Sequence, residues 1–386
     1  MRVAGLPPGK RGVNPLASTD RAGKRFPRWP THGYSIHMKT FLRFAMPLLV
    51  AAVFCPRGFA ANEWEADKLI AKLTKKLGRI VVPEGKADGE TFEERIEYLR
   101  VQSRDLDIEA DPPMRGVNFV TIGKPKSDRA PSMGLPLKNV PLSELIRGEA
   151  DYCGMTFVVE PCAVLVHPVG YKLINPVSRQ EVVSDLEELS RVVIFPEVSF
   201  ERATIEEVIE YLRIKGGCCD AEPGALTQVN VILLANRAET GLSLSIDVKN
   251  ISWNDALRYL AEMAGLKLRF QTHAAVISPV DKALDGQIQI MGKGLAKAQA
   301  DQIILKTAEF QNVTIRDVIE FVRLKTRDLD PAKEGVSIAV GPGVSLNKTV
   351  DLSLKQIPVS ELLRYCAELT GHSLSADDRT FVLSAK

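Results

Sequence analysis

Between residues 192 and 213, the hydrophobic positions change from the spacing of a strand to that of a helix. The apolar run Val192–Phe195 ends at Pro196 and predicts a strand. A helix should follow, because Thr204 and Glu207 can form a capping box at its start. Its predicted apolar face has helical spacing and consists of Ile205, Val208, Ile209 and Leu212.

The next stretch predicts a second helix between strands. Residues 229–234 predict a strand, and residues 242–248 alternate between apolar and polar, which is typical of a half-buried strand. Ser252 should cap a helix that ends at Gly265, and residues 266–277 then form a closing hairpin. The predicted order, strand–helix–strand–strand–helix–strand–strand, is a small α+β fold with two helices on one face of a short sheet.

This pattern occurs three times in the chain. One ten-residue block aligns without gaps at residues 91–100, 204–213 and 314–323, and a second at 137–146, 248–257 and 354–363. Between them, the stretches Val117–Val120, Val229–Ile232 and Val336–Ala339 also correspond. A polar helix is predicted before each copy, over Glu63–Lys76, Arg179–Leu189 and Leu295–Ile304. We therefore predict three tandem βαββαββ modules, at residues 61–170, 171–282 and 283–386.

Residues 1–60 have a different composition and are predicted to be a leader. A short basic stretch from Met38 precedes the uncharged apolar run Phe44–Phe54, whose eleven residues are fewer than the roughly 20 that span a bilayer. Small residues favour signal-peptide cleavage after Ala60. Translation is then expected to start at Met38, with residues 1–37 a misassigned gene start. A long tail before an uncleaved anchor is the alternative.

Removing this leader changes the charge of the protein. The full chain has 50 basic and 48 acidic residues, and the leader contains ten of the basic residues and one acidic residue. The remaining 40 basic and 47 acidic residues give a net charge of −7, which disfavours nucleic-acid binding. The hydrophobic content of 45% is that of ordinary globular proteins and does not indicate disorder, and no membrane span is expected after signal removal.

The second block resembles the short N-terminal domain shared by secretins and TonB-dependent receptors, and the related periplasmic N domains of secretins. An alternating strand ending in Lys-Asn, a capped helix ending in Gly, and a hairpin carry the resemblance, at about residues 133–168, 243–280 and 350–385. The resemblance implies modules that stack or bind partner proteins and do no chemistry. Because neither a pore region nor a receptor barrel follows the third copy, it implies a soluble periplasmic relative that consists of such modules.

The side chains with catalytic or ligand chemistry are scattered. His167, His273 and His372 are single residues without the neighbours of a zinc site, and no nucleophile or phosphate-binding motif occurs. No catalytic, cofactor or metal site is therefore predicted, and the protein is not expected to be an enzyme. Cys153 and Cys162 could form a local disulfide in an oxidising compartment; two packed thiols are the alternative.

Two acidic clusters also leave alternatives open. Ser103–Asp107 and Thr326–Asp330 each follow a predicted helix and could hold a cation or a basic partner, or form a solvated helix exit. The leading functional hypothesis is a periplasmic or secreted protein that binds envelope proteins or itself through its repeated modules. The alternative is a periplasmic protein that binds a ligand or senses a signal through a cleft between modules.

Overall fold

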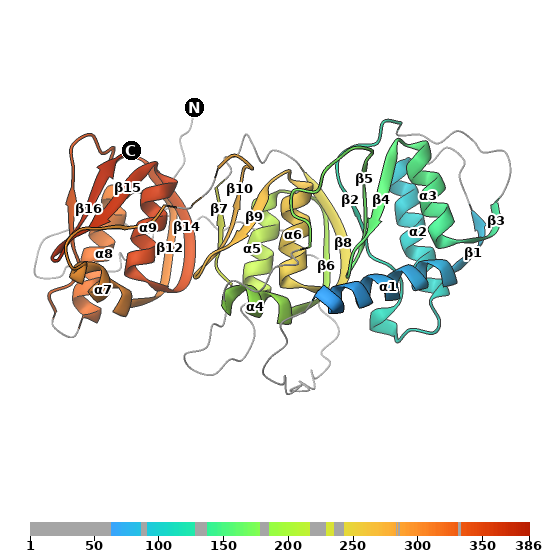
Figure 1. The fold of residues 1–386 in the computed structure, drawn as a ribbon, viewed down its shortest axis with the longest axis horizontal. Coiled ribbons are helices and arrows are strands. Elements are labelled where there is room, and N and C mark those ends of the chain that lie inside the picture. The colour runs from blue at the N-terminus through green and yellow to red at the C-terminus, as the bar shows by residue number, and fades with distance from the viewer. Residues whose placement is uncertain are drawn as a thin grey trace, which may run out of the picture. The chain divides into compact units, whose positions relative to one another are not determined.

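The computed structural model describes residues 63–85, 91–127, 137–177, 185–216, 229–234, 243–282, 284, 286–330 and 333–386. All of them belong to one compact unit, Arg57–Lys386. The predicted leader, with the cleavage site after Ala60, lies outside the described residues. Helices and strands alternate and the strands form several small sheets (Figure 1), which confirms the α+β class. In the described part of the chain, no helix has the length and apolar character of a membrane span.

The helices and strands follow the same order in three stretches, called here the first, second and third segments. The first contains α1 (Glu63–Arg79), β1 (Val81–Gly85), α2 (Phe92–Leu106), β2 (Phe119–Thr121), β3 (Leu137–Pro141), α3 (Leu142–Tyr152), β4 (Met155–Val159) and β5 (Val164–Pro168), with a short 3₁₀ turn at Pro112–Met114. The second contains α4 (Asp185–Val192), β6 (Ile194–Ala203), α5 (Ile205–Gly216), β7 (Val231–Leu233), β8 (Leu244–Ser252), α6 (Trp253–Met263), β9 (Lys267–Phe270) and β10 (Ala275–Ser278).

The third segment has one additional short strand. It contains β11 (Gln289–Ile290), α7 (Leu295–Gln302), β12 (Ile304–Thr314), α8 (Ile315–Leu329), β13 (Ser337–Val340), β14 (Thr349–Pro358), α9 (Val359–Leu369), β15 (His372–Ala376) and β16 (Thr380–Ala385). The predicted capping boxes agree with the structure. The Thr91 hydroxyl accepts from the Glu94 N–H at 3.3 Å, and the Thr91 N–H donates to the Glu94 carboxylate at 2.7 Å. Thr204 and Glu207 form the same capping box. The strand predicted from Val192 begins only at Ile194, because Val192 ends α4, and the predicted helix start at Arg179 lies outside the described residues.

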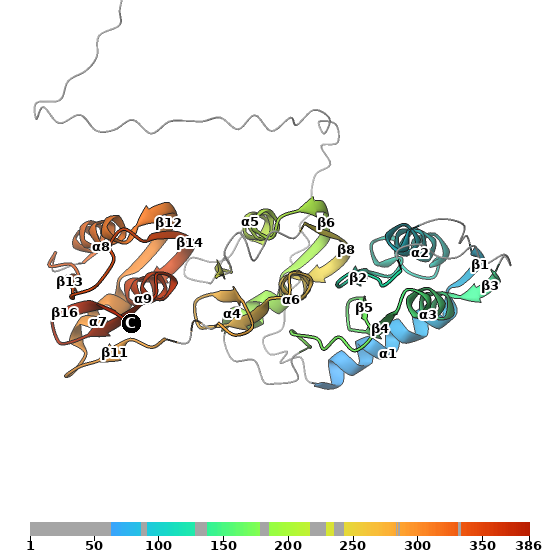
Figure 2. The ribbon, with the colours of Figure 1, turned by 90° about the horizontal axis from the view of Figure 1, so that it is seen from above.

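The strands of each segment divide between two sheets, whereas the sequence pattern predicted a single sheet. Each segment contains one antiparallel pair: β1 with β3, β6 with β8, and β12 with β14. Its other strands lie in the orders β4-β5-β2, β9-β10-β7 and β11-β15-β16-β13. Strand β2 also pairs with β8 of the second segment, so that β4-β5-β2-β8-β6 is one five-stranded sheet. In the third segment, α8 and α9 lie between the two sheets in both views (Figures 1 and 2).

The composition of the helices explains this arrangement. Helix α6 buries eight of its eleven residues, and these lie on nearly all sides of the helix: Trp253, Ala256, Leu257, Arg258, Tyr259, Leu260, Ala261 and Glu262. A helix that is buried nearly all round needs cover on more than one side, and a single sheet supplies only one. The helices were therefore predicted correctly, but their placement on one face of one sheet was not.

The middle sheets contribute to two hydrophobic cores at once. Along β5, Val164 and Val166 pack in the core of α2 and α3, whereas Leu165 between them packs in the core of α5 and α6. Along β10, Ile277 packs with α5 and α6, and Val276 packs with α8 and α9. Because successive strand residues point to opposite faces, each of these sheets separates two helical layers and completes the core of the following segment.

Candidate interaction surfaces

The residues singled out for chemistry lie apart from one another. Among the described residues, no group of three or more His, Cys, Asp and Glu side chains could hold a metal ion. His372 is buried, and its Nε2 accepts from the Ser345 N–H at 3.3 Å while its Nδ1 lies 2.8 Å from the Thr370 hydroxyl. Burial lowers the pKa of His372, and the Lys348 ammonium adds to this effect. His372 is therefore held neutral inside the third segment.

Cys153 and Cys162 are both thiols in this structure and have different surroundings. Cys153 is fully buried at the end of α3, where its sulfur accepts from Arg95 Nη2 at 3.1 Å. Cys162 lies in the turn between β4 and β5 and donates to the Asp255 carboxylate of the second segment at 3.2 Å. Burial, and then the Asp255 carboxylate, raise the pKa of Cys162. A disulfide between the two cysteines stays a prediction.

The two acidic clusters hold loops of the chain itself. Asp107 is 1% exposed and accepts from the Gly116 N–H at 3.1 Å, and the Lys76 ammonium lies 2.6 Å from its carboxylate. Asp330 accepts from the Gly335 N–H in the same way, at 2.9 Å. These carboxylates fix the loops that lead into β2 and β13. The sequence analysis considered a basic partner for these clusters. For Asp107 this partner is helix α1 of the same chain, through Lys76 and Arg79.

A side-chain amide joins each segment to the next. Asn118 donates through Nδ2 to the carbonyls of Cys162 and Lys249, each at 2.9 Å, and its Oδ1 accepts from the Lys249 N–H at 2.9 Å. Asn230 forms the same three bonds with the His273 carbonyl and with the carbonyl and N–H of Lys355, at 2.9, 2.9 and 2.7 Å. In each case the side-chain amide bonds both the N–H and the carbonyl of one residue in the next segment, as a peptide group of a paired strand would.

A buried arginine forms a second link at each of these two junctions, Arg258 at the first and Arg364 at the second. Arg258 lies 2.6 Å from the Glu160 carboxylate of the first segment, both side chains being about 5% exposed, and also contacts Asp255. Its Nη1 donates to the Asn175 carbonyl at 3.2 Å, and its guanidinium stacks over the Tyr259 ring at 4.4 Å from the ring centre. A buried ion pair with additional hydrogen bonds fixes geometry, because either partner alone would be strongly unfavourable.

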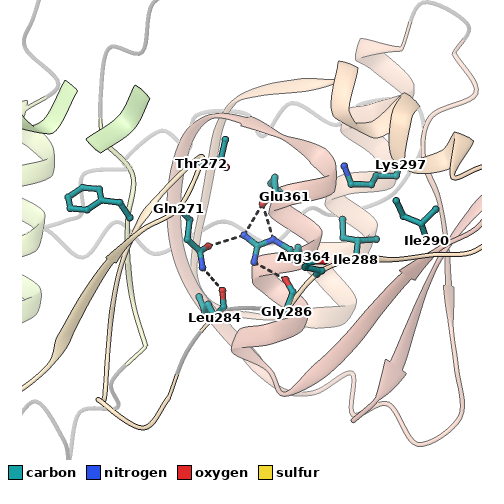
Figure 3. Close-up of a pocket in the computed structure, with 11 residues that line it drawn as sticks. Gln271, Thr272, Leu284, Gly286, Ile288, Ile290, Lys297, Glu361 and Arg364 are labelled. Carbon is teal, nitrogen blue, oxygen red and sulfur yellow. Dashed lines mark hydrogen bonds and ion pairs between the residues drawn. The ribbon is translucent and has the colours of Figure 1, made fainter. Parts of the chain in front are cut away.

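Arg364 is the counterpart of Arg258 in the third segment and lies in a cavity of about 450 Å³ (Figure 3). It donates to Glu361 at 2.9 Å, to the Gly286 carbonyl at 3.2 Å and to the Gln271 side chain at 3.0 Å. All three guanidinium nitrogens therefore have protein acceptors. The cavity lies between the second and third segments. Its two lining cations are both paired, Arg364 with Glu361 at 2.8 Å and Lys297 with Asp301 at 2.6 Å, so neither is a free cation for a ligand.

The first segment lacks this arrangement on α3. Arg147 is the counterpart of Arg258 in the second block, but its side chain is 57% exposed and pairs only with Glu144 of its own helix among the described residues. Gly148 occupies the position of Tyr259 and has open space around it. The helix surface that forms a junction in the second and third segments is thus polar and exposed in the first.

At the other end, the outer face of the third segment's sheet is also uncovered. In the first two segments this face is apolar and buried, through Val120 paired with Leu165 and Ile232 paired with Val276. The corresponding pair is Ala339 with Val382, which are exposed and half-buried. This face of the third segment therefore has a smaller side chain in place of a larger one and is left partly exposed in the described chain.

The sequence analysis missed the residues at the junctions. Asn118 and Asn230 were aligned in corresponding stretches but were assigned no role, and Arg258 and Arg364 were not considered. The signal was an arginine followed by a tyrosine directly after the second block, which recurs in the second and third copies. Comparisons with protein-family models, with curated proteins and with solved structures find no match to this chain.

Proposed function

We propose that this chain is a non-enzymatic protein-interaction protein of the cell envelope, built of three tandem modules at residues 61–170, 171–282 and 283–386. Each module would be similar to the N-terminal domains of secretins and TonB-dependent receptors. The observation that supports this proposal best is the pair of equivalent junctions at Asn118 and Asn230, which use the same three hydrogen bonds. A chain that stacks its own modules through a repeated contact has the surfaces to dock further domains.

The distribution of buried polar groups favours a structural use of the junctions. Glu262 is 1% exposed and accepts from the Tyr171 hydroxyl and from the N–H groups of Ile174 and Asn175, at 2.9, 2.8 and 2.6 Å. These contacts tie the connection between the first two modules to α6. A buried carboxylate that accepts from several donors of one connection contributes to the rigidity of the junction.

The two ends of the described chain are the natural places for partners. Arg147 on α3 and Ala339 on β13 lie on exposed faces whose counterparts in the other modules are covered by a neighbouring module. Each end is therefore expected to contact another protein in the envelope, either a different protein or a second copy. Because no chemistry is assigned to these surfaces, binding is the expected function.

Site-specific photocrosslinking in the cells that express the protein tests this proposal. A photoreactive amino acid replaces Arg147 or Ala339, and Glu188, an exposed residue on α4 away from both ends, serves as the control position. We expect discrete protein adducts from the two end positions and none from Glu188, in the envelope fraction. N-terminal sequencing of the same material should begin at Ala61. A protein that gives no adducts from either end and stays monomeric would contradict the proposal.

A further inference from the structure

The outer edge of β13 differs from its two counterparts in one respect. In the described residues, β13 ends its sheet and has β16 on one side only. Strand β2, its counterpart in the first segment, pairs on the same side with β8, in antiparallel orientation, through Phe119 opposite Asp247. In the second segment, Asn230 beside β7 bonds to Lys355 of β14 on this side. Among the described residues, β7 and β13 both end their sheets, but β13 has neither a paired strand nor an asparagine contact of this kind on this side.

Two arginines accompany this edge in the first segment and hold the strand that pairs with it. Arg104 Nη2 lies 3.3 Å from the Asp247 carboxylate, and Arg100 Nε lies 3.9 Å from the same carboxylate. Arg100 also donates to the Phe119 carbonyl at 3.2 Å, which ties it to the strand edge. The carboxylate opposite Phe119 thus lies beside two guanidinium groups, an arrangement in which charge and hydrogen bonding act together.

The same two arginines recur in α8, beside the open edge. Arg323 donates to the Ile338 carbonyl at 2.6 Å, as Arg100 does to Phe119, and its side chain is 44% exposed. Arg327 lies against the Gly335 loop as Arg104 lies against the Gly116 loop. Arg327 is exposed and forms no ion pair among the described residues. No carboxylate of the described residues takes the place of Asp247 there.

The second segment shows that the arginine pair and the carboxylate go together. Its first block has Arg213, but the position that corresponds to Arg104 is Gly217 in the sequence. The position of β14 that corresponds to Asp247 is Ser353. Where the second arginine is absent, the aspartate is absent too. The third segment keeps both arginines, which indicates that its open edge receives a carboxylate from outside the described chain.

We propose that the open edge of β13 binds an extended strand of a partner protein in antiparallel orientation, with an aspartate or glutamate opposite Ile338 and beside Arg323 and Arg327. Strand addition of this kind supplies main-chain hydrogen bonds, and the arginine pair selects the register. The third segment has Ser337 at the position of Asn118 and therefore lacks its side-chain amide. The ion pair with the two arginines is then the main contact that fixes the register of the added strand. This inference rests on the proposed function and names one surface and one partner chemistry for it.

The chain itself offers a probe for this edge. A fluorescent peptide with the sequence of Leu244–Ser252 contains Asp247 in its native context, and its Asp247→Asn version is the matched control. Both are titrated by fluorescence anisotropy against the protein purified from the cells that express it. We expect saturable binding of the aspartate peptide, and about three- to tenfold weaker binding of the asparagine peptide, with the difference shrinking as salt is raised.

Variants of the protein show whether β13 is the site. The double variant Arg323→Gln, Arg327→Gln should bind both peptides equally weakly, whereas Lys325→Gln, which removes a charge from another face of α8, should bind like the wild type. A charge exchange distinguishes loss of the contact from loss of the fold. The double variant Arg323→Glu, Arg327→Glu should bind an Asp247→Lys peptide more tightly than the aspartate peptide.

The outcomes separate this inference from the proposed function. Absence of saturable binding up to about 1 mM peptide, or binding that the arginine variants leave unchanged, would overturn the β13 site while adducts from Arg147 would still support a protein-interaction role. Peptide binding that follows the charge exchange supports the β13 site, even if crosslinking in cells yields no partner and the proposed function fails.

Discussion

The replacement of Asn230 by alanine tests how the second and third segments are joined. Asn230 is 3% exposed, and its amide forms three hydrogen bonds with the main chain, two of them to Lys355 of β14. A hydrogen bond contributes roughly 1 kcal/mol net, and more when a buried partner is left unsatisfied. Because Lys355 is an exposed residue, we expect water to replace part of the lost bonding and the free energy of unfolding to fall by about 2–3 kcal/mol.

Urea denaturation combined with hydrogen exchange measures this effect. Since coupled segments need not unfold in one step, the exchange rate of the Lys355 amide gives the local result. It should rise in Asn230→Ala, because its acceptor, the Asn230 side-chain oxygen, has been removed. Ser337→Ala is the matched control, as Ser337 occupies the corresponding position in β13 and is exposed, and its effect should stay within about 0.5 kcal/mol.

The aspartate variant adds a pH signature that a simple packing defect would lack. In Asn230→Asp, an oxygen replaces the Nδ2 donor and faces the carbonyls of His273 and Lys355. The neutral carboxyl is then favoured in the folded state, so stability relative to the wild type should recover as the pH is lowered. The reasoning is refuted if Asn230→Ala unfolds within 0.5 kcal/mol of the wild type and leaves the Lys355 amide equally protected.

Three further predictions follow from the cores and the buried charges. Leu165→Ala should lower the free energy of unfolding by about 2–5 kcal/mol and speed exchange in α6, since Leu165 packs in that core; a change confined to α3 would contradict this. Glu160→Gln leaves Arg258 with Asp255 as its remaining carboxylate partner and should cost roughly 3 kcal/mol in urea denaturation, whereas a neutral result would mean that the pair is dispensable. Burial lowers the pKa of His372, so the unfolded chain binds a proton first and stability should fall below about pH 6.5. His372→Gln should flatten this part of the pH curve, and an unchanged slope would count against the assignment.

The recurrence of a rare backbone conformation shows why the repeated motif was recognisable. Asn139, Asn250 and Gln356 adopt positive φ values of 53°, 49° and 50°. They follow a lysine in the strand that precedes the second helix of each segment, and asparagine tolerates this left-handed conformation better than most residues. The Lys-Asn signature that carries the family resemblance thus records a local backbone requirement, which a sequence can express directly.

Local interactions were therefore well predicted. The capping boxes at Thr91 and Thr204, the helix starting after Ser252 and the hairpin that closes the second segment all depend on residues within about ten positions of each other. Alternation along residues 242–248 also identified β8 correctly, although the strand continues to Ser252. The predicted helix at Leu295–Ile304 ends at Gln302, because Ile304 begins β12.

The sequence alone determined the secondary structure, the threefold recurrence and the caps, because these depend on the period of apolar residues and on short-range hydrogen bonds. Only the tertiary structure decided that Leu165 belongs to the core of the following segment and that Asn118, Arg258 and the edge of β13 are the contact positions. Hydrophobic periodicity reports that a side chain is buried, but not by which element. That choice depends on contacts between residues more than a hundred positions apart, such as Asn118 with Lys249 and Asn230 with Lys355.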